Sequence, residues 1–515
     1  MTDSTSPVSG AGSPVSRTGA AGAPQVAASG ERVAGAGELR RNVLTPRHVL
    51  IVAIAATGPM SVVALNYGPM ASFAGPALVL AFVVSLVGIV LLGLCFSQFA
   101  RHYPSAGGLY AWAVRSFGNN GGFVYGWLFA GSYLVFAAAG FAVFGGWGEQ
   151  YIETIFGVKI AWWIFSLAAI AYTSVLAYFG IRTSVGSAFV LLAFELIVAF
   201  VFAAYVWGDH PAGVSAFTSK PFLPSSSPGG WAAIGLAMTF GVLSSVGFEE
   251  ASTMSEEARD ARRTIGRGMV WAGFITQAFY ILTAYALLIG YGDFAKFSKD
   301  PAPLLTLGEG RGKVWLTFVV LAALSSILAF SQTAFNAGIR VIYALGREGV
   351  VPHMFGRTHH RHHTPHVSIA LMTVVAVALA FPLAFSVGAF NVWFYFGFLI
   401  SIAFLVLYGL TAIGLIFTAF RDKRAFPTVN PLTHVVIPLA AAALMAYPLY
   451  RTVSPLPPGV YRTLPLYLIG WLVIGVGVLF YLRRSRPDAI ARVGSLMAGG
   501  EPEPTGGGEA TSFRA

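Results

Sequence analysis

Long apolar segments separated by short polar segments dominate the chain from residue 48 to residue 482. Each segment comes close to, or exceeds, the about 20 residues that a helix needs to cross the hydrocarbon core of a bilayer. This pattern predicts an all-α membrane protein. Its twelve transmembrane helices are expected near residues 48–74, 76–100, 121–148, 160–179, 184–207, 231–253, 264–291, 314–345, 367–386, 390–419, 433–450 and 464–482.

The first apolar segment carries helix-breaking residues at its middle, where residues 57–61 read Thr-Gly-Pro-Met-Ser. Pro59 has no amide hydrogen and its ring clashes with the carbonyl of Ala55, so two half-helices are expected. Within hydrocarbon such a break survives only where protein buries it or where it lines a wet cavity. The amides of Met60 and Ser61 would then open the second half-helix at a positive dipole end, which suits a carboxylate. An ordinary proline kink is the alternative.

The sixth apolar segment shows the same fault, because Ser244, Ser245 and Gly247 interrupt it ahead of Glu249. It follows the first segment by five spans. Two interrupted spans at corresponding positions of two five-span halves are typical of a transporter with inverted repeats and a binding site at the middle of the membrane. The second break therefore favours a site over a kink.

The composition places the charges outside the apolar segments. Hydrophobic residues make up 56% of the chain and charged residues 10%, and the mean hydropathy is +0.71. With alternate loops assigned to opposite sides, 24 of the 32 Lys and Arg residues fall on the side of the termini and 8 on the other. Positive loops face the cytoplasm, so both termini are expected there, in a multi-pass protein of the cell membrane. The net charge of +11 is therefore no sign of nucleic-acid binding.

The ends of the chain are rich in Gly, Ala, Ser and Pro without periodicity, which is typical of disordered tails. The expected organisation is a cytoplasmic tail at 1–45, a ten-helix core at 46–420 with repeats 46–210 and 228–420, two peripheral helices within 421–485, and a second tail at 486–515.

Five motifs carry a family resemblance: AGP at 74–76, PSAGGLYAW at 104–112, GFEEASTMSEEARD at 247–260 followed by RRTI at 262–265, RVIYALGREGVVP at 340–352 and TPH at 364–366. Together they resemble the permeases of the amino acid-polyamine-organocation superfamily. The resemblance implies a leucine-transporter-type core, a 5+5 inverted repeat with broken helices 1 and 6, and two added helices.

The resemblance also implies where a substrate binds. In such permeases the substrate carboxylate meets backbone amides at a Gly-Ser/Thr-Gly motif in helix 1, which here aligns with Pro59, Met60 and Ser61. The loss of both glycines departs from the family pattern and puts the closest backbone approach in doubt. Candidate substrate-binding residues are those of the two breaks: Gly58, Met60, Ser61, Phe240, Ser244, Ser245 and Gly247. The substrate's amino group would meet the carbonyls between Phe240 and Ser244.

Two carboxylates are candidates for coupling and gating. Glu195 is the one charged residue of the fifth apolar segment, and a carboxylate at that depth is by default functional. It lies where some proton-coupled relatives carry a lysine and related sodium symporters hold an ion, so it would take a proton or help bind a cation; a neutral packing glutamate is the alternative. Glu249 matches the family's GFE signature and is interpreted either as an inner-gate residue or as a helix cap.

The sequence therefore predicts a secondary active transporter that imports amino acids, driven by protons. The alternatives are an amine or polyamine permease or an exchanger on the same fold, and a membrane-embedded sensor or channel. Its partners would be a small-molecule substrate, a co-transported cation (H+) and the lipid bilayer. With one cysteine, no phosphate loop and no Ser-His-Asp arrangement, no enzyme, cofactor or metal is expected. The histidine-rich stretch 353–366 leaves metal binding or pH sensing open beside a solvated basic loop.

Overall fold

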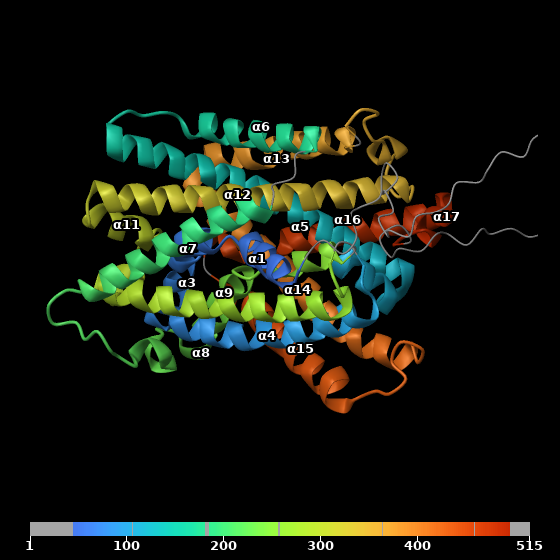
Figure 1. Cartoon of the computed structure of the whole chain (residues 1–515), viewed down its shortest axis with the longest axis horizontal. Coiled ribbons are helices and arrows are strands. Elements are labelled where there is room, and N and C mark those ends of the chain that lie inside the picture. Colours follow the sequence, from blue (N-terminus) through green and yellow to red (C-terminus); the bar gives the residue numbers. More distant parts are fainter. Residues whose placement is uncertain are drawn as a thin grey trace, which may run out of the picture. The chain divides into compact units, whose positions relative to one another are not determined.

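The computed structural model describes residues 45–105, 107–180, 185–255, 258–362, 364–457 and 459–494, with backbone alone at 185–188 and at Thr253. The predicted tail at 1–45, apart from Thr45, and residues 495–515 of the predicted tail at 486–515 lie outside these residues. The helices are α1 (Pro46–Ala56), α2 (Pro59–Leu65), α3 (Tyr67–Ala74), α4 (Leu78–His102), α5 (Gly108–Phe156), α6 (Trp162–Phe179), α7 (Val185–Gly208), α8 (Gly230–Leu243), α9 (Ala261–Tyr291), α10 (Phe294–Phe297), α11 (Pro303–Gly310), α12 (Lys313–Arg347), α13 (His366–Val387), α14 (Val392–Arg421), α15 (Ile437–Arg451), α16 (Leu464–Ser485) and α17 (Pro487–Ala491), shown in Figure 1.

Among the described residues, twelve helical segments are long and apolar enough to cross a membrane. They correspond one to one with the predicted spans, so the predicted all-α fold with twelve spans is confirmed. The third span differs most, because α5 begins at Gly108 instead of near residue 121. Its first turns are separated from the rest by non-helical Gly118.

The chain is interrupted within the first span. Helix α1 ends at Ala56, and Gly58 adopts φ 58° and ψ 67°, a left-handed conformation that a residue with a side chain adopts only at a cost. Helix α2 begins at Pro59, where the missing amide hydrogen leaves no intrahelical bond unmade. Its first helical hydrogen bond joins the amide of Val62 to the carbonyl of Gly58 at 3.2 Å.

The sixth span is also interrupted. Helix α8 ends at Leu243, Gly247 has φ 111°, and the chain continues as the 3-10 helix η4 (Phe248–Met254). The sequence interpretation expects a second half-helix here, and the structure supplies a tighter 3-10 helix in its place. Because Gly247 has no side chain, it can approach the first interruption: a Cβ on it would lie 2.6 Å from the carbonyl oxygen of Ala56.

Helices α4 and α9 pack against one another with their backbones close. A Cβ added at Gly93 would meet Val270 at 3.1 Å, one at Gly266 would meet Ser97 at 2.3 Å, and one at Gly273 would meet Ile89 at 2.7 Å. Small residues at a helix interface permit such approach and increase van der Waals contact in membranes. The two helices run side by side along the lower part of Figure 1.

The folded part extends past the predicted start of the C-terminal tail at residue 486. The short helix α17 follows α16, and Ile490 and Val493 are buried. The side-chain amide of Asn119 donates to the carbonyls of Ile490 and Ala491 at 3.0 and 2.8 Å. The amide of Gly494 donates to Glu348 at 2.8 Å, so this segment is held against the ends of α5 and α12.

Replacing Gly58 with alanine should lower the stability of the protein. The left-handed conformation costs a residue with a Cβ about 1–2 kcal/mol. The new methyl would also lie 2.7 Å from Ser61 Oγ and 3.3 Å from the carbonyl oxygen of Ser326. We expect Gly58→Ala to melt several degrees lower in detergent.

The matched control is Gly470→Ala, on α16, where an added Cβ meets nothing within 4 Å. It should melt at or slightly above the wild-type temperature, since alanine favours the helix. Equal melting temperatures for the two variants would contradict the strained interruption.

Candidate functional site

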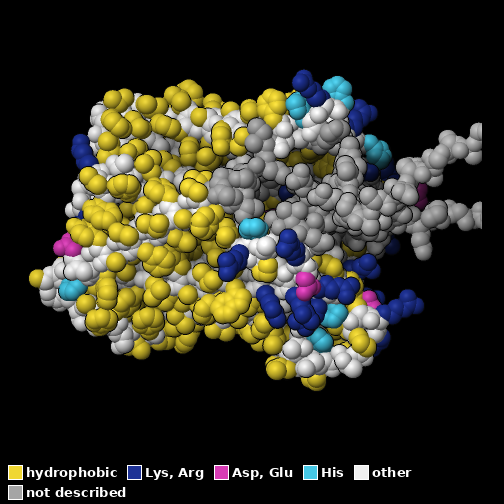
Figure 2. All heavy atoms as spheres, viewed as in Figure 1, with side chains coloured by type: hydrophobic (Ala, Val, Ile, Leu, Met, Phe, Trp, Pro, Cys, Tyr) yellow, Lys and Arg dark blue, Asp and Glu magenta, His cyan; other side chains and the backbone are white. Residues whose placement is uncertain are grey.

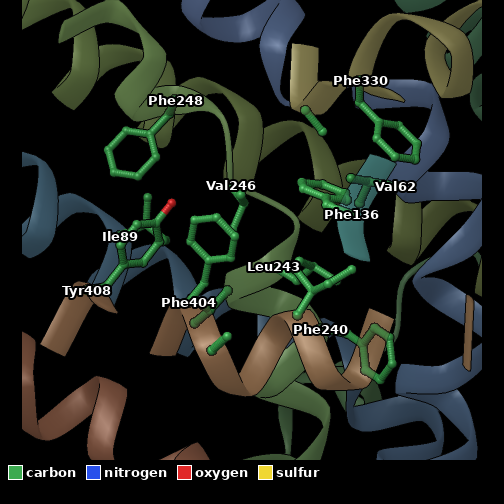
Figure 3. Close-up of a cluster of buried hydrophobic side chains, with 14 of the residues drawn as sticks. Val62, Ile89, Phe136, Phe240, Leu243, Val246, Phe248, Phe330, Phe404 and Tyr408 are labelled. Carbon is green, nitrogen blue, oxygen red and sulfur yellow. The ribbon is translucent and has the colours of Figure 1, made fainter. Parts of the chain in front are cut away.

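A small cavity lies beside the interruption of the first span. Its volume is about 10 Å³, which is room for about one water molecule. The cavity is lined by polar, aliphatic and aromatic side chains with no charged residue among them: Thr57, Ser61, Val62, Asn66, Phe136, Leu243, Phe330 and Trp393. Figure 3 shows four of the apolar ones, Val62, Phe136, Leu243 and Phe330, gathered together. The structure therefore holds this site closed.

The hydroxyls at the break satisfy backbone carbonyls at the helix ends. Thr57 Oγ1 donates to the carbonyl of Ile54 at 2.7 Å, and Ser61 Oγ donates to the carbonyl of Gly58 at 2.6 Å. Such bonds replace helical hydrogen bonds that the break removes. Of the residues predicted at the first break, Ser61 lines the cavity, while Gly58 and Met60 precede it along the chain.

Asn66 links three helices beside the cavity. Its side-chain oxygen accepts from the indole of Trp393 on α14 at 2.9 Å, and its amide nitrogen donates to Ser244 Oγ at 2.9 Å. The same nitrogen lies 3.5 Å from the carbonyl oxygen of Phe240. Phe240 and Ser244, both predicted, do not line the cavity but bond to Asn66, a lining residue that the sequence analysis does not identify. A lone asparagine in an apolar run was the available signal.

Ser245 faces a different partner. Gln277 on α9 donates to Ser245 Oγ at 2.9 Å and to the carbonyl of Gly241 at 2.7 Å. The carbonyl of Phe240 already accepts from the amide and hydroxyl of Ser244. A substrate amino group that met these carbonyls would share them with side chains already in place.

Glu195 lies on α7 and is 3% exposed. Ser325 Oγ on α12 donates to its carboxylate at 3.3 Å. The backbone amide of Met60, at the start of α2, and the side chain of Ser326 lie beside the same carboxylate, outside hydrogen-bond geometry. This carboxylate therefore joins α7 to α12 beside the interruption of the first span.

Glu249 caps the start of η4. Its Oε2 accepts from the amide of Gly247 at 2.9 Å and from the hydroxyl of Tyr408 at 2.8 Å. Its Oε1 is buried without a hydrogen-bond partner among the described residues. The neighbouring Glu250 accepts from Tyr133 at 3.1 Å. Figure 3 shows Tyr408 near Phe248. The cap geometry is present, and the predicted gating role stays a prediction.

Comparison with known proteins decides the family, because the family model described as "Amino acid permease" matches residues 49–479. The chain belongs to the amino acid permease family. This permease is 25% identical over 414 residues to the low-affinity putrescine importer PlaP of Escherichia coli (strain K12), covering 78% of the chain and 86% of that protein. It is 24% identical over 322 residues to the branched-chain amino acid permease BcaP of Bacillus subtilis (strain 168), covering 58% and 66%.

A third relative is the methylthioribose transporter of Bacillus subtilis (strain 168), 23% identical over 443 residues, covering 80% of the permease and 87% of that protein. The family and the twelve helical spans make this chain a multi-pass membrane protein of the amino acid-polyamine-organocation superfamily. The relatives are all named as transporters of small molecules, although the substrates in their names differ.

The histidine-rich stretch of the permease forms an ordered turn between α12 and α13. His359 Nδ1 accepts from the amides of Arg361 and His362 at 3.2 and 3.3 Å. Partial burial, together with the charges of neighbouring histidines and Arg361, holds the pKa of His359 below its usual value. Among described residues, which exclude His363, no group of three or more His, Cys, Asp or Glu side chains could hold a metal. The two bonds that His359 accepts hold the backbone of this turn.

Removing the Asn66 side chain should destabilise the permease. Asn66→Ala leaves the buried indole N–H of Trp393 without its acceptor, which costs about 1–3 kcal/mol. We expect a clearly lower melting temperature in detergent. Asn391→Ala is the matched control, because that exposed asparagine donates only to the carbonyl of Val387, one turn earlier in the chain. A similar small effect in both variants would show that the Asn66 bonds contribute nothing.

Proposed function

We propose that this permease is a secondary active transporter that imports amino acids with neutral side chains across the cytoplasmic membrane, driven by protons. The observation that carries the proposal is the closed cavity between the two interrupted spans, lined by aromatic and small polar side chains. A site of this kind at discontinuous helices is typical of transporters with inverted repeats. Two repeats, 46–210 and 228–420, and a cytoplasmic location of both termini are part of the proposal.

The cavity supports an uncharged side chain on the substrate. No Lys, Arg, Asp or Glu lines it, and Phe136, Phe330 and Trp393 lie with ring centroids 5.1–6.1 Å apart. Burying a second charge there without a partner would be unfavourable. The naming of a similar protein as a branched-chain amino acid permease agrees with an apolar pocket. The pocket has to widen before a substrate enters, so binding and helix movement are linked.

The substrate carboxylate is assigned to the start of α2. The amides of Met60 and Ser61 are the second and third of that helix, and both lie at its positive end. The carbonyls near Phe240 and Ser244 are assigned to the amino group. Because Asn66 and Ser244 already bond there, we propose that substrate binding exchanges these internal bonds for bonds to the ligand.

Glu195 is assigned to proton coupling because its carboxylate bonds to α12 and lies beside the first break. An ionised carboxylate accepts strongly from Ser325 and attracts the nearby Met60 amide, whereas a protonated one interacts more weakly with both. A proton on Glu195 thus changes the same segment that would receive the substrate. Linkage is reciprocal, so substrate binding changes the affinity for the proton equally. The proton would be released where the site opens to the cytoplasm.

Glu249 is assigned to closure of the inner side. Its carboxylate joins Gly247, in the second break, to Tyr408 on α14. When η4 moves relative to α14, the two hydrogen bonds of Glu249 have to break, or Tyr408 has to move with η4.

Glu195→Gln should separate exchange from coupling. The variant resembles the protonated state, so exchange of labelled for unlabelled substrate in liposomes should persist, while accumulation driven by a pH gradient is lost. Glu309→Gln, which removes an exposed carboxylate at α11, should behave as wild type. Accumulation by Glu195→Gln under a proton gradient alone would exclude Glu195 as the coupling residue. A requirement of wild type for sodium at constant pH would exclude proton coupling itself.

A second candidate function is amine import. It is favoured by the nearness of Glu195 to the Met60 amide, because an ionised carboxylate there would repel a substrate carboxylate at the same amide. The similarity to a putrescine importer points the same way. A channel or sensor is a third class, which counterflow of labelled substrate in liposomes distinguishes, since only a carrier exchanges substrate against its gradient.

Pairs of amino acids and their decarboxylated analogues separate the first two functions. Leucine should compete for uptake about 10- to 100-fold better than isoamylamine, because a carboxylate bound by amides contributes one or more charge-assisted hydrogen bonds. Ornithine and putrescine form a second pair that tests a charged side chain. Equal competition by leucine and isoamylamine, or strong competition by putrescine alone, would replace the amino acid proposal with the amine proposal.

A further inference from the structure

Four arginines from two helices converge on one open pocket of about 550 Å³. Arg101 lies at the last turn of α4, and Arg262, Arg263 and Arg267 lie in the first two turns of α9. Asp260 completes the lining. Figure 2 shows Lys and Arg side chains gathered, with an acidic side chain among them, beside a broad hydrophobic surface.

The register of the two helices explains why the arginines meet. Gly93 lies against Val270 and Gly266 against Ser97, so α4 and α9 run antiparallel and one turn further brings Arg101 opposite Arg262. The pocket is therefore held by a tightly packed pair of helices, although its arginine side chains are exposed.

Among the described residues, the charges that line the pocket are unbalanced. Four guanidinium groups and one carboxylate line it. Arg263 Nε lies 3.9 Å from Asp260 Oδ2, and both side chains are mostly exposed. Such a pair contributes little. An anion with several acceptor oxygens would offset the repulsion, since guanidinium groups match phosphate geometry well.

The exposed apolar residues of both helices lead directly to these arginines. On α4, Val87, Leu94 and Arg101 follow one another at intervals of seven residues, so they lie on one face. On α9, Arg263 and Arg267 are followed by Trp271 (56% exposed) and Phe274 (42% exposed) at intervals of four, four and three. Membrane helices commonly carry this order of residues from the headgroup level into the hydrocarbon: arginine first, then tryptophan, then aliphatic and aromatic residues.

We propose that this pocket binds the phosphate headgroup of an anionic phospholipid, whose acyl chains lie along the exposed faces of α4 and α9. The recognised chemistry is a phosphate group, and the apolar faces assign it to a lipid and not to free phosphate. Basic pockets between membrane helices bind such headgroups. The general excess of positive charge in cytoplasmic loops requires arginines on this side, but it does not require four of them in one pocket that continues into apolar faces. The inference rests on the chain's being a membrane permease and not on its substrate.

The test uses the purified full-length permease in detergent and native mass spectrometry with phosphatidylglycerol or phosphatidylcholine. Wild type should retain phosphatidylglycerol preferentially. Each arginine near a membrane surface contributes about fivefold to the affinity, so Arg263→Gln/Arg267→Gln should bind about 25-fold more weakly. Arg483→Gln/Arg484→Gln removes the same charge from the last turn of α16, away from the pocket, and should retain the lipid. If the first double variant does not stay monodisperse, Arg101→Gln alone should lower retention about fivefold.

Three results would overturn the proposal. Equal loss of phosphatidylglycerol in the two double variants would show that overall charge, and not the pocket, retains the lipid. Equal retention of both lipids by wild type would show that the headgroup is not recognised. Inorganic phosphate is compared with phosphatidylglycerol as the control for a soluble anion. If phosphate raises the melting temperature of wild type as much as phosphatidylglycerol does, and does not raise that of Arg263→Gln/Arg267→Gln, the pocket binds a soluble anion. None of these results depends on uptake, so they leave the proposed transport function separately testable.

Discussion

The two interrupted spans touch through their backbones, and the site depends on this contact. Gly247 lies so close to Ala56 that a Cβ would come within 2.6 Å of its carbonyl oxygen. Only glycine permits both this approach and the φ of 111° at that position. The contact fixes the end of α1 against the start of η4. It thereby sets the positions of Thr57 and Ser61 on one side of the cavity and of Leu243 on the other.

Bringing two breaks together inside an apolar protein leaves backbone and side-chain polar groups that water cannot reach, and unmade hydrogen bonds there are costly. The structure satisfies several of them with short polar side chains and with amides from other helices. Thr57 and Ser61 bond within their own segment, whereas Asn66 and Gln277 reach carbonyls of α8. In the proposed function the same groups recognise a substrate, so that closure without ligand and binding of ligand would use the same hydrogen-bonding groups.

The sequence predicts the features that depend on local chemistry. Hydropathy locates all twelve spans, and Pro59 and Gly247 mark the interruptions because their backbone restrictions act within a few residues. It does not predict the link between Trp393 and Asn66, which are 327 residues apart, because a lone amide in an apolar run has many conceivable partners. It likewise misses that Glu195 lies beside the Met60 amide, since the pairing requires the relative rotation of two helices.

The glycines between α4 and α9 have a mechanical consequence. Where Val270, Ser97 and Ile89 fill the space left by Gly93, Gly266 and Gly273, one helix cannot slide past the other without lifting these side chains out of contact. The pair therefore behaves as a single rigid body. A transport cycle that exposes the site first to one side of the membrane and then to the other has to place its hinges elsewhere, at the unwound segments. In such a cycle α4 and α9 would move together.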